Sequence, residues 1–443
     1  MIAGIFIIPT MLSQAELSTA MPKAGGTYFF IFRSLGSYLG TTAGLSSWFS
    51  LVLKSAFALV GIGAFASLIF PGITEIQIKL VSVAFCVFFT ILNVVGTKHA
   101  GRMQVLMVVF LFLILLLYVA KGMPKVVSYN FHNFFVSDFK TLFMTAGMVF
   151  ISFLGLTKIV SVAEEIKNPT KNIPLAMITA FLSVSLLYIL VVFVTVGVMG
   201  DNLLTADGKY SLTPISDGAQ VMMGNWGMYV LSLGALLAFF STANAGLMAA
   251  SRDPLAMSQD QLIPSAMGKI HPKFNTPVNS ILVTSIMMIA VIFLPLETLV
   301  KTASTMMLLL FIFVNISLVI MRESGIQNYR PKFRSPLYPW LQIFAVVVYS
   351  FLIVEMGKIP LIITSVFIIF SIIWFLFYGR IRSNKESALV QLVNRIKSKD
   401  LETTSLETEL KEIIRERDNL HKDRFDKLIE QAIILDIDHS VSK

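Results

Sequence analysis

The chain has 443 residues, of which 56% are apolar and only 14% are charged, whereas about 25% of the residues of an ordinary soluble domain are charged. This composition excludes a soluble globular protein and indicates a polytopic membrane protein, because each crossing of the bilayer takes about 20 mostly apolar residues. The formal net charge of +9 does not indicate a nucleic-acid partner, since basic residues also collect in the cytoplasmic loops of membrane proteins.

Apolar stretches separated by short polar loops predict an all-α membrane bundle over residues 1–380. A partial helix and ten full spans are expected at 1–21, 41–70, 76–96, 103–120, 141–165, 174–199, 225–251, 278–295, 301–321, 338–356 and 361–378. If the loops alternate sides, one side carries fourteen Lys and Arg residues and the other carries seven. The positive-inside rule makes the first side cytoplasmic, and it places the tail after Tyr378 inside the cell.

Lys54 is the clearest polar anomaly, because it lies near the centre of the span 41–70. A lysine at that depth costs about 2.5–3.5 kcal/mol on insertion scales, so we expect its ammonium to face a cavity, a partner or a pathway. A proton-exchanging group and a structural lysine bonded to carbonyls or hydroxyls are equally supported alternatives.

The stretch FMTAGMVFISFLGLTKIVSVAEEIKNPTKNIP, residues 143–174, begins apolar, reaches Gly155 in mid-span and then becomes polar. Unwinding over 152–156 would free backbone groups at the ends of two half-helices, which can hold an ammonium, a carboxylate or a small cation. Glycine also serves close helix packing, so this break is a hypothesis. Lys158 is a candidate second titratable group, or one that contacts cytoplasmic water.

Enzyme chemistry and cofactors are not expected. Glu164 and Glu165 are adjacent, so on a helix their side chains diverge, and no nucleophile or histidine accompanies them. A gate or loop ion pair with Lys167 or Lys171 is the better interpretation. The single cysteine, Cys86, allows no disulfide within the chain, and the five histidines lack metal-binding spacing.

In the span 225–251, hydroxyl and amide groups follow at one-turn spacing at Ser241, Thr242 and Asn244. They are candidates for coordinating an ion. Serine and threonine also bond to their own helix backbone, which is the plainer role for either residue alone.

Three stretches resemble one family, the amino acid-polyamine-organocation superfamily. AELSTAMPKAGGTYFF is similar to its loop after the second helix, SFLGLTKIVSVAEEIKNPTKNIP to its sixth helix and following loop, and STANAGLMAASRDPLAMSQDQLIP to its eighth helix and exit loop. The resemblance implies the leucine-transporter-like fold, which has two five-helix repeats that are inverted relative to each other. In this fold the first and sixth helices are broken, and they cross at the substrate site. Carried onto this chain, the sixth-helix contribution falls on Ile151, Ser152, Phe153, Leu154 and Gly155. Phe150 or Phe153 would be an aromatic lid.

The resemblance implies secondary transport of an amino acid in the plasma membrane, coupled to a proton or a sodium ion or run as exchange. Sodium-coupled relatives use hydroxyls of the eighth helix. Proton-coupled members with a buried lysine carry it in the fifth helix, which here contains none, so Lys54 is only a candidate substitute. The spans 41–70, 225–251 and 301–321 contain no Asp or Glu, which favours neutral amino acids over a polyamine or organic cation. A membrane sensor or scaffold that does not transport is the alternative from another class; the oligomeric state stays open.

The resemblance also implies a missing element. Five spans should precede Phe143 and only four do, while the GIF at positions 4–6 ends nine residues before Ala15. We therefore interpret residues 1–14 as the inner half of the family's second helix and expect its first helix to be absent from this sequence. If the 443 residues are the whole protein, we expect negligible amino acid uptake in proteoliposomes, and saturable uptake would contradict this.

The tail, residues 381–443, is rich in charge and has Leu406, Leu410, Ile413 and Ile414 at helical spacing. We expect a solvated cytoplasmic helix or linker there. The end of the chain resembles the first strand of a universal-stress-protein-like domain, at 432–437. The glycine-rich nucleotide loop of such domains is not present, so we expect no nucleotide binding.

Overall fold

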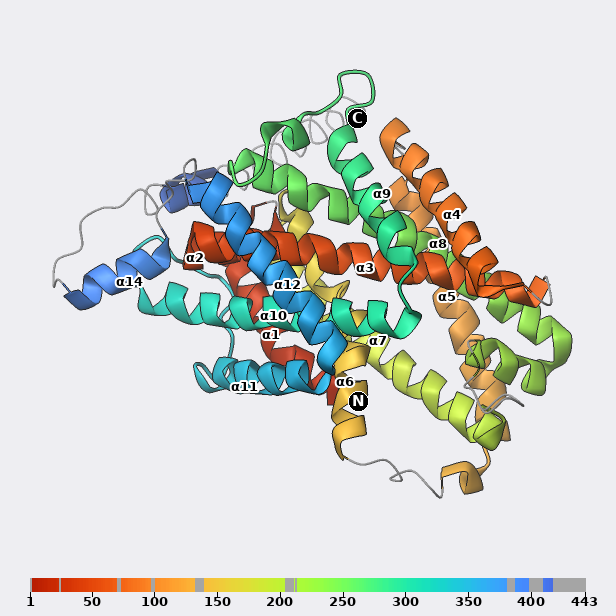
Figure 1. Ribbon diagram of the computed structural model, residues 1–443. Helices are drawn as coiled ribbons and strands as arrows, with labels where there is room; N and C mark the ends of the chain where they lie inside the picture. Colours follow the sequence, from red (N-terminus) through yellow and green to blue (C-terminus); the bar gives the residue numbers. More distant parts are fainter. Residues whose placement is uncertain are drawn as a thin grey trace, which may run out of the picture.

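The computed structural model describes residues 2–23, 25–69, 73–96, 100–131, 139–203, 211, 213–380, 387–397 and 409–416. In these ranges the regular elements are all helices (Figure 1). Nine of the described helices are long and apolar enough to cross a membrane, and two shorter apolar helices accompany them. The protein is therefore an all-α polytopic membrane protein.

The helices follow one another in an order close to the predicted spans. The first six are α1 (Ile2–Ala20), α2 (Gly26–Leu35), α3 (Ser37–Ile69), α4 (Glu75–Val95), α5 (Ala100–Gly122) and α6 (Phe139–Phe153). The later ones are α7 (Pro169–Met199), α8 (Pro214–Gln259), α9 (Val278–Ile292), α10 (Leu296–Glu323), α11 (Trp340–Glu355), α12 (Lys358–Trp374) and α14 (Ala388–Lys397). The short 3-10 helices are η1 (Met123–Lys125), η2 (Ser128–Phe131), η3 (Leu156–Glu165), η4 (Gly200–Leu203) and η5 (Ser265–Gly268), and a π-turn, η6, covers Phe375–Gly379.

The N-terminal GIF lies inside one continuous helix with the AELS stretch, because α1 runs from Ile2 to Ala20. Gly4 faces the end of α6 and the side of α7, where a Cβ would lie 3.6 Å from the Phe153 ring. The close contact with α6 and α7 places α1 beside the segment in which the sequence predicts a break.

Helix α3 lies at the centre of the bundle, with α8, α10, α2, α4 and α9 packed along it (Figure 1). Helix α8 is longer than predicted: it begins at Pro214, bends at Gly224, where φ is 70°, and continues to Gln259. Gly246 of α8 allows a close approach of the two long helices, since a Cβ there would overlap the Ser55 hydroxyl. The seam between α3 and α8 extends from Gly44 beside Met257 to Gly61 beside Phe239 and carries the polar groups discussed below.

A buried polar network fastens α1 to α10 and α11. Pro9 interrupts the hydrogen bonding of α1, and the Tyr349 hydroxyl donates to the Phe6 carbonyl at 2.5 Å and contacts the Thr10 hydroxyl at 2.8 Å. Asn315 of α10 also donates to Thr10, at 2.8 Å. These bonds satisfy backbone and side-chain groups that lipid cannot satisfy.

Glu16 of the AELS stretch is wholly buried at the other end of α1. Its carboxylate accepts hydrogen bonds from both Nε and Nη2 of Arg322, from the Ser335 backbone NH at 2.6 Å and from the Tyr329 hydroxyl at 3.1 Å. Burial and the Glu16 charge raise the pKa of Tyr329 well above its usual value, which keeps that hydroxyl protonated as a donor. Glu16 therefore ties α1 to the end of α10 and to the loop that follows it.

The described part of the tail is not a fully solvated helix. Helix α14 packs against α2 and α10, and Ala388 at its start is buried. In the segment 409–416, Leu410 and Ile413 are also buried, in the same apolar cluster as residues of α1, α2 and α10. The expectation of a solvated segment fails here because these apolar residues cover α2. The predicted strand at 432–437 and Leu406 lie outside the described residues.

Candidate functional site

The α-helical part of α6 ends at Phe153, inside the stretch 152–156 where the sequence predicts a break. Leu154 and Gly155 form a turn, and η3 continues from Leu156 with tighter 3-10 geometry. The Leu154 NH bonds to the Ile151 carbonyl at 3.3 Å and the Lys158 NH to the Gly155 carbonyl at 3.1 Å. Each bond joins residues three apart, so the regular α-helical pairing is lost across the turn.

The predicted substrate residues divide into a buried and an exposed group. Ile151, Phe153 and Leu154 are buried, whereas Ser152 and Gly155 are exposed. Nothing lies within 4 Å of the position that a Cβ of Gly155 would take. The turn therefore opens to free space at Gly155.

The two phenylalanines suggested as lids have packing partners. The Phe150 ring lies 5.7 Å from Tyr349 and 6.5 Å from Phe311. The Phe153 ring lies 6.2 Å from Phe181 and 6.1 Å from Tyr188, both on α7. In this conformation both rings hold α6 to its neighbours.

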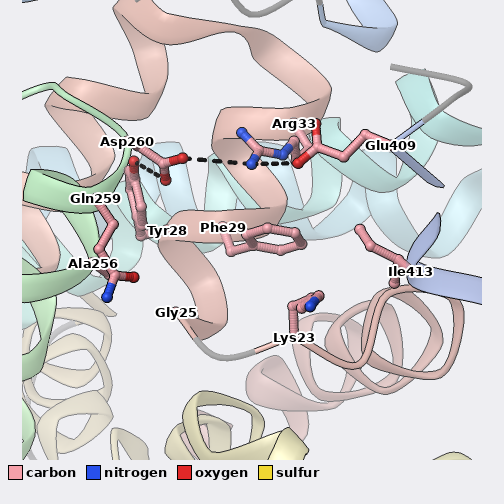
Figure 2. A pocket seen from close by; sticks show the side chains of 10 residues that line it. All are labelled: Lys23, Gly25, Tyr28, Phe29, Arg33, Ala256, Gln259, Asp260, Glu409 and Ile413. Atoms are coloured by element: carbon pink, nitrogen blue, oxygen red, sulfur yellow. Dashed lines mark hydrogen bonds and ion pairs between the residues drawn. The ribbon is translucent and has the colours of Figure 1, made fainter. Parts of the chain in front are cut away.

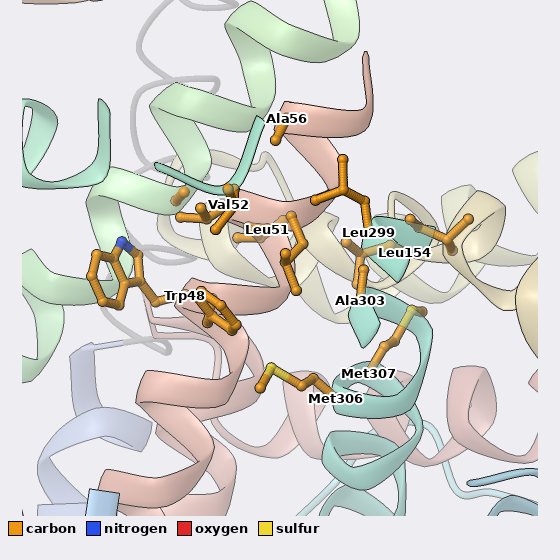
Figure 3. Close-up of a cluster of buried hydrophobic side chains, with 14 of the residues drawn as sticks. Trp48, Leu51, Val52, Ala56, Leu154, Leu299, Ala303, Met306 and Met307 are labelled. Carbon is orange, nitrogen blue, oxygen red and sulfur yellow. The ribbon is translucent and has the colours of Figure 1, made fainter. Parts of the chain in front are cut away.

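Leu154 belongs to the apolar cluster at the centre of the bundle (Figure 3). Its side chain lies by Leu299 and Ala303 of α10, and Leu51 of α3 belongs to the same cluster. The turn after α6 is thus seated where α3 and α10 meet.

Lys158 joins η3 to both long helices of the bundle. Its ammonium donates to the Ser47 hydroxyl of α3 at 3.1 Å and lies 4.0 Å from the Asp253 carboxylate of α8. The side chains of Lys158 and Asp253 are only 18% and 9% exposed. A partly buried ion pair with a hydroxyl bridge therefore connects the segment after the break to α3 and α8.

Asp253 was not selected from the sequence, because the span was expected to end at residue 251. Leu247, Ala250 and Met257 are nearly fully buried, and their helical spacing continues across that boundary. This spacing is the signal that would have extended the helix and placed Asp253 within it. An acid is therefore present in α8, although residues 225–251 contain none.

Lys54 lies on the same face of α3 as Ser47, two helical turns further along. Among the residues that the structure describes, none forms a hydrogen bond or an ion pair with its ammonium. The side chain is only partly exposed, and its electrostatic neighbour in the described ranges is Lys158. The structure thus places Lys54 and Lys158 near each other, along the α3–α8 seam.

The eighth-helix residues lie further along α8. Asn244 accepts a hydrogen bond from Asn93 of α4 at 2.7 Å, which ties the two helices together. Ser241 is buried and Thr242 half-buried. Twelve residues separate Ser241 from Asp253, a distance of about 18 Å along a helix. These groups and the Lys158–Asp253 pair are therefore separate parts of the seam.

Glu164 and Glu165 end η3. Their side chains lie outside the described part of the structure, so their pairing with Lys167 or Lys171 stays a prediction.

A cavity of about 260 Å³ lies between α2, the end of α8 and the tail segment 409–416 (Figure 2). The Arg33 side chain is only 4% exposed. Its Nη2 atom lies 3.4 Å from Oδ1 of Asp260 and 2.6 Å from Oε1 of Glu409. The Tyr28 hydroxyl donates to Asp260 at 2.8 Å, and burial and the Asp260 charge raise the pKa of Tyr28 well above its usual value. Arg33 thus holds the exit of α8 and the tail together, a contact that the sequence analysis missed.

Replacing Arg33 by alanine is expected to destabilise the protein by about 3 kcal/mol, because it removes one partner from buried ion pairs. The free energy of unfolding of the purified protein in detergent, measured by denaturant titration, checks this. Lys23→Ala is the matched control, since the Lys23–Glu416 pair is more exposed and is worth about 0–1 kcal/mol. Equal losses for the two variants would show that Arg33 has no special role.

Comparison with known proteins gives a consistent result. The model of the family described as "Amino acid permease" matches residues 1–386. The chain is 25% identical over 399 residues to the branched-chain amino acid permease BcaP of Bacillus subtilis (strain 168), covering 86% of this chain and 84% of that protein. It is 26% identical over 360 residues to the methylthioribose transporter of the same organism, and the match covers 78% of this chain and 77% of that transporter. It is 23% identical over 360 residues to the serine/threonine exchanger SteT of the same organism, and the match covers 78% of this chain and 79% of that exchanger.

Proposed function

The chain belongs to the amino acid permease family, and from this premise we propose that it moves amino acids across the plasma membrane by alternating access. Family members are transporters rather than enzymes, and their fold is the leucine-transporter-like one. The end of α6 at Phe153, with open space at Gly155, carries the proposal. Backbone groups freed at such a turn bind the charged groups of an amino acid. In this proposal the substrate binds at the residues Ile151, Ser152, Phe153, Leu154 and Gly155.

A neutral amino acid is the substrate class that the observations favour. The names of two relatives state branched-chain amino acids and serine or threonine as their substrates. A polyamine would need uncompensated carboxylates inside the bundle. Asp253, the acid described next to the turn, already faces the Lys158 ammonium, which argues against the polyamine or organic-cation antiporter.

For coupling we infer two alternative ions, a proton or sodium, which would act at different sites. A proton would act at Lys54 or at Lys158, whose Asp253 partner is buried with it. Sodium would bind near Ser241, Thr242 and Asn244, which supply oxygen ligands. Glu164 and Glu165 remain candidates for a gate. Uptake measured in proteoliposomes at several pH values, with sodium present or replaced by choline, separates the two ions.

The substrate is identified by uptake of a tritiated L-amino acid, in competition with each of the others. The protein is produced from its own gene, with any in-frame codons that precede Met1. We expect saturable uptake that a small set of neutral amino acids suppresses. Neither uptake nor binding of any amino acid would favour the sensor or scaffold alternative.

Filling the open space at the turn is expected to abolish most transport. Gly155→Leu adds a side chain where the glycine has no neighbour within 4 Å, so folding is spared while the proposed substrate position is occupied. We expect uptake to fall by at least about 10-fold, which corresponds to about 1.4 kcal/mol, with an unchanged melting temperature. Ser350→Ala, which only removes a hydroxyl from an exposed side chain of α11 that bonds to its own helix backbone, is the control. Normal uptake by Gly155→Leu would remove the turn from the site.

A further inference from the structure

The tail segment 409–416 lies on the bundle with one apolar face. It is helical, and Leu410 and Ile413 lie three residues apart on the same face. Both side chains are almost fully buried, in an apolar cluster that also contains Met11 of α1 and Val160 of η3. A helix of eight residues is not stable alone in water, so contacts with the bundle hold the tail segment in its helical form.

Both ends of the tail segment are acidic, and both meet basic groups of the bundle. Oε1 of Glu409 lies 2.6 Å from Nη2 of Arg33, and Oε2 of Glu416 accepts a hydrogen bond from the Lys23 ammonium at 2.6 Å. The Arg33 side chain is buried, so its pair with Glu409 is shielded from water, whereas the Lys23–Glu416 pair is more exposed. The tail segment therefore complements this surface in charge as well as in apolar contact.

The surface under the tail segment belongs to two groups of helices. Lys23 follows α1, which packs against α6, α7 and η3, whereas Asp260 ends α8, which packs against α3, α4 and α9. Arg33 of α2 joins the two, because its Nη2 atom faces Asp260 as well as Glu409 (Figure 2). The two ion pairs of the tail segment thus connect the end of α1 to the end of α8.

Helix α2 is also in close contact with the segment that follows the turn. A Cβ on Gly26 of α2 would lie 2.5 Å from the Ser161 hydroxyl of η3. On its other side η3 is joined to α8 by the pair of Lys158 and Asp253. If η3 moves away from α8, α2 must either move with η3 or lose contact with it. The tail segment opposes both movements, since it binds the loop after α1, α2 and, through Arg33, the end of α8.

The tail segment covers the cavity of about 260 Å³ rather than a close-packed core. Lys23, Tyr28 and Asp260 line this cavity from the bundle, and Glu409 and Ile413 line it from the tail. Release of the tail segment would expose charged and polar groups, which water can solvate. The helices beneath therefore do not need the tail segment in order to fold.

We propose that the tail segment is an autoinhibitory strap, which holds α1, α2 and η3 against the end of α8 while it is bound and thereby slows transport. The inference goes beyond the proposed function and rests on it, because a transporter of this fold works by rocking one group of helices against another. A contact that exists in only one of two conformations shifts the population toward that conformation. Release of the tail segment therefore favours opening on the side where α8 ends.

The test uses the whole protein from its own gene and two measurements. Hydrogen exchange of the backbone amides of 409–416, followed by mass spectrometry, reports whether the tail segment is bound. The initial rate of uptake of a tritiated mixture of L-amino acids into proteoliposomes reports transport.

Two variants release the tail segment in different ways. Glu409→Gln removes its ion pair with Arg33, which keeps Asp260 as a partner. Ile413→Asp places a charge in the apolar cluster. Glu412→Gln is the matched control, since Glu412 is an exposed acid of the same segment and has no ion pair among the described residues.

In the unchanged protein and in Glu412→Gln we expect exchange at least about 10-fold slower than in the two releasing variants, a ratio that corresponds to about 1.4 kcal/mol. In a variant that releases the tail segment, uptake is expected to be at least about 5-fold faster, which corresponds to about 1 kcal/mol.

Release of the tail segment without faster uptake would overturn the inference and leave the proposed function standing. Exchange at the same rate in the unchanged protein and in both releasing variants would overturn it too, because these side chains would then not hold the tail segment. If neither the unchanged protein nor a releasing variant takes up any amino acid, the proposed function fails together with the inference.

Discussion

Glu16→Gln is expected to cost the protein about 3 kcal/mol or more of its free energy of unfolding, because breaking a buried ion pair leaves the other charge without compensation. The carboxylate is wholly buried and accepts bonds from the Arg322 guanidinium, the Ser335 backbone and the Tyr329 hydroxyl. Glutamine has nearly the same shape, but one of its two acceptor oxygens becomes an NH₂ donor that faces these donors. Denaturant titration of the purified protein in detergent measures the loss.

The control for this substitution is Glu297→Gln. Glu297 pairs with Lys301 on the surface of α10, and its side chain is 67% exposed. Exposed pairs of this kind contribute about 0–1 kcal/mol. If the two variants lose stability equally, the Glu16 network does not have the structural importance assigned to it.

Asp253→Asn is expected to reduce uptake by about 100-fold, the effect of about 2.7 kcal/mol, because it leaves the Lys158 ammonium half-buried without its carboxylate. Lys158→Met should reduce uptake by a similar factor, because it leaves the buried Asp253 carboxylate without its ammonium partner. The double variant Asp253→Asn with Lys158→Met removes both charges, so we expect it to fold better than either single variant and to recover stability.

A double-mutant cycle separates pairing from individual roles. Melting temperatures and uptake rates of the two single variants and the double variant are measured in the same lipid. An interaction free energy in stability of about 1–3 kcal/mol indicates a coupled pair. The Lys158 ammonium and the Asp253 carboxylate lie 4.0 Å apart. If the losses of stability and uptake in the double variant equal the sum of those in the two single variants, the two residues do not act as a pair.

The sequence was sufficient for the features that depend on local composition. Apolar length predicted the helices in order, and Gly155 between apolar and polar residues predicted where regular α-helix would end; the cytoplasmic side assigned from loop charge stays a prediction. The three family-like stretches indicated the family that the comparison shows. Each of these signals lies within one segment of about 20–30 residues, which is the range over which helical periodicity and membrane length act.

The missed features join residues that are far apart in the chain. Glu16 and Arg322 are separated by 306 positions, and no local pattern says that the glutamate of AELS needs that arginine. Asp253 was missed because the polar residues after 251 were interpreted as a loop, whereas α8 continues to Gln259. Arg33 binds Asp260 and a tail residue, Glu409. The expected absence of the family's first helix depends on where the natural chain begins and stays a prediction.

Accumulation of a tritiated amino acid into proteoliposomes tests the claim of secondary active transport most directly. The protein from its own gene is reconstituted, and internal radioactivity is followed with and without an imposed pH, sodium or counter-substrate gradient. The account predicts saturable accumulation above the external concentration when one of these gradients is present, and loss of that accumulation when it is dissipated. Internal radioactivity equal to that of protein-free liposomes under every gradient would contradict it.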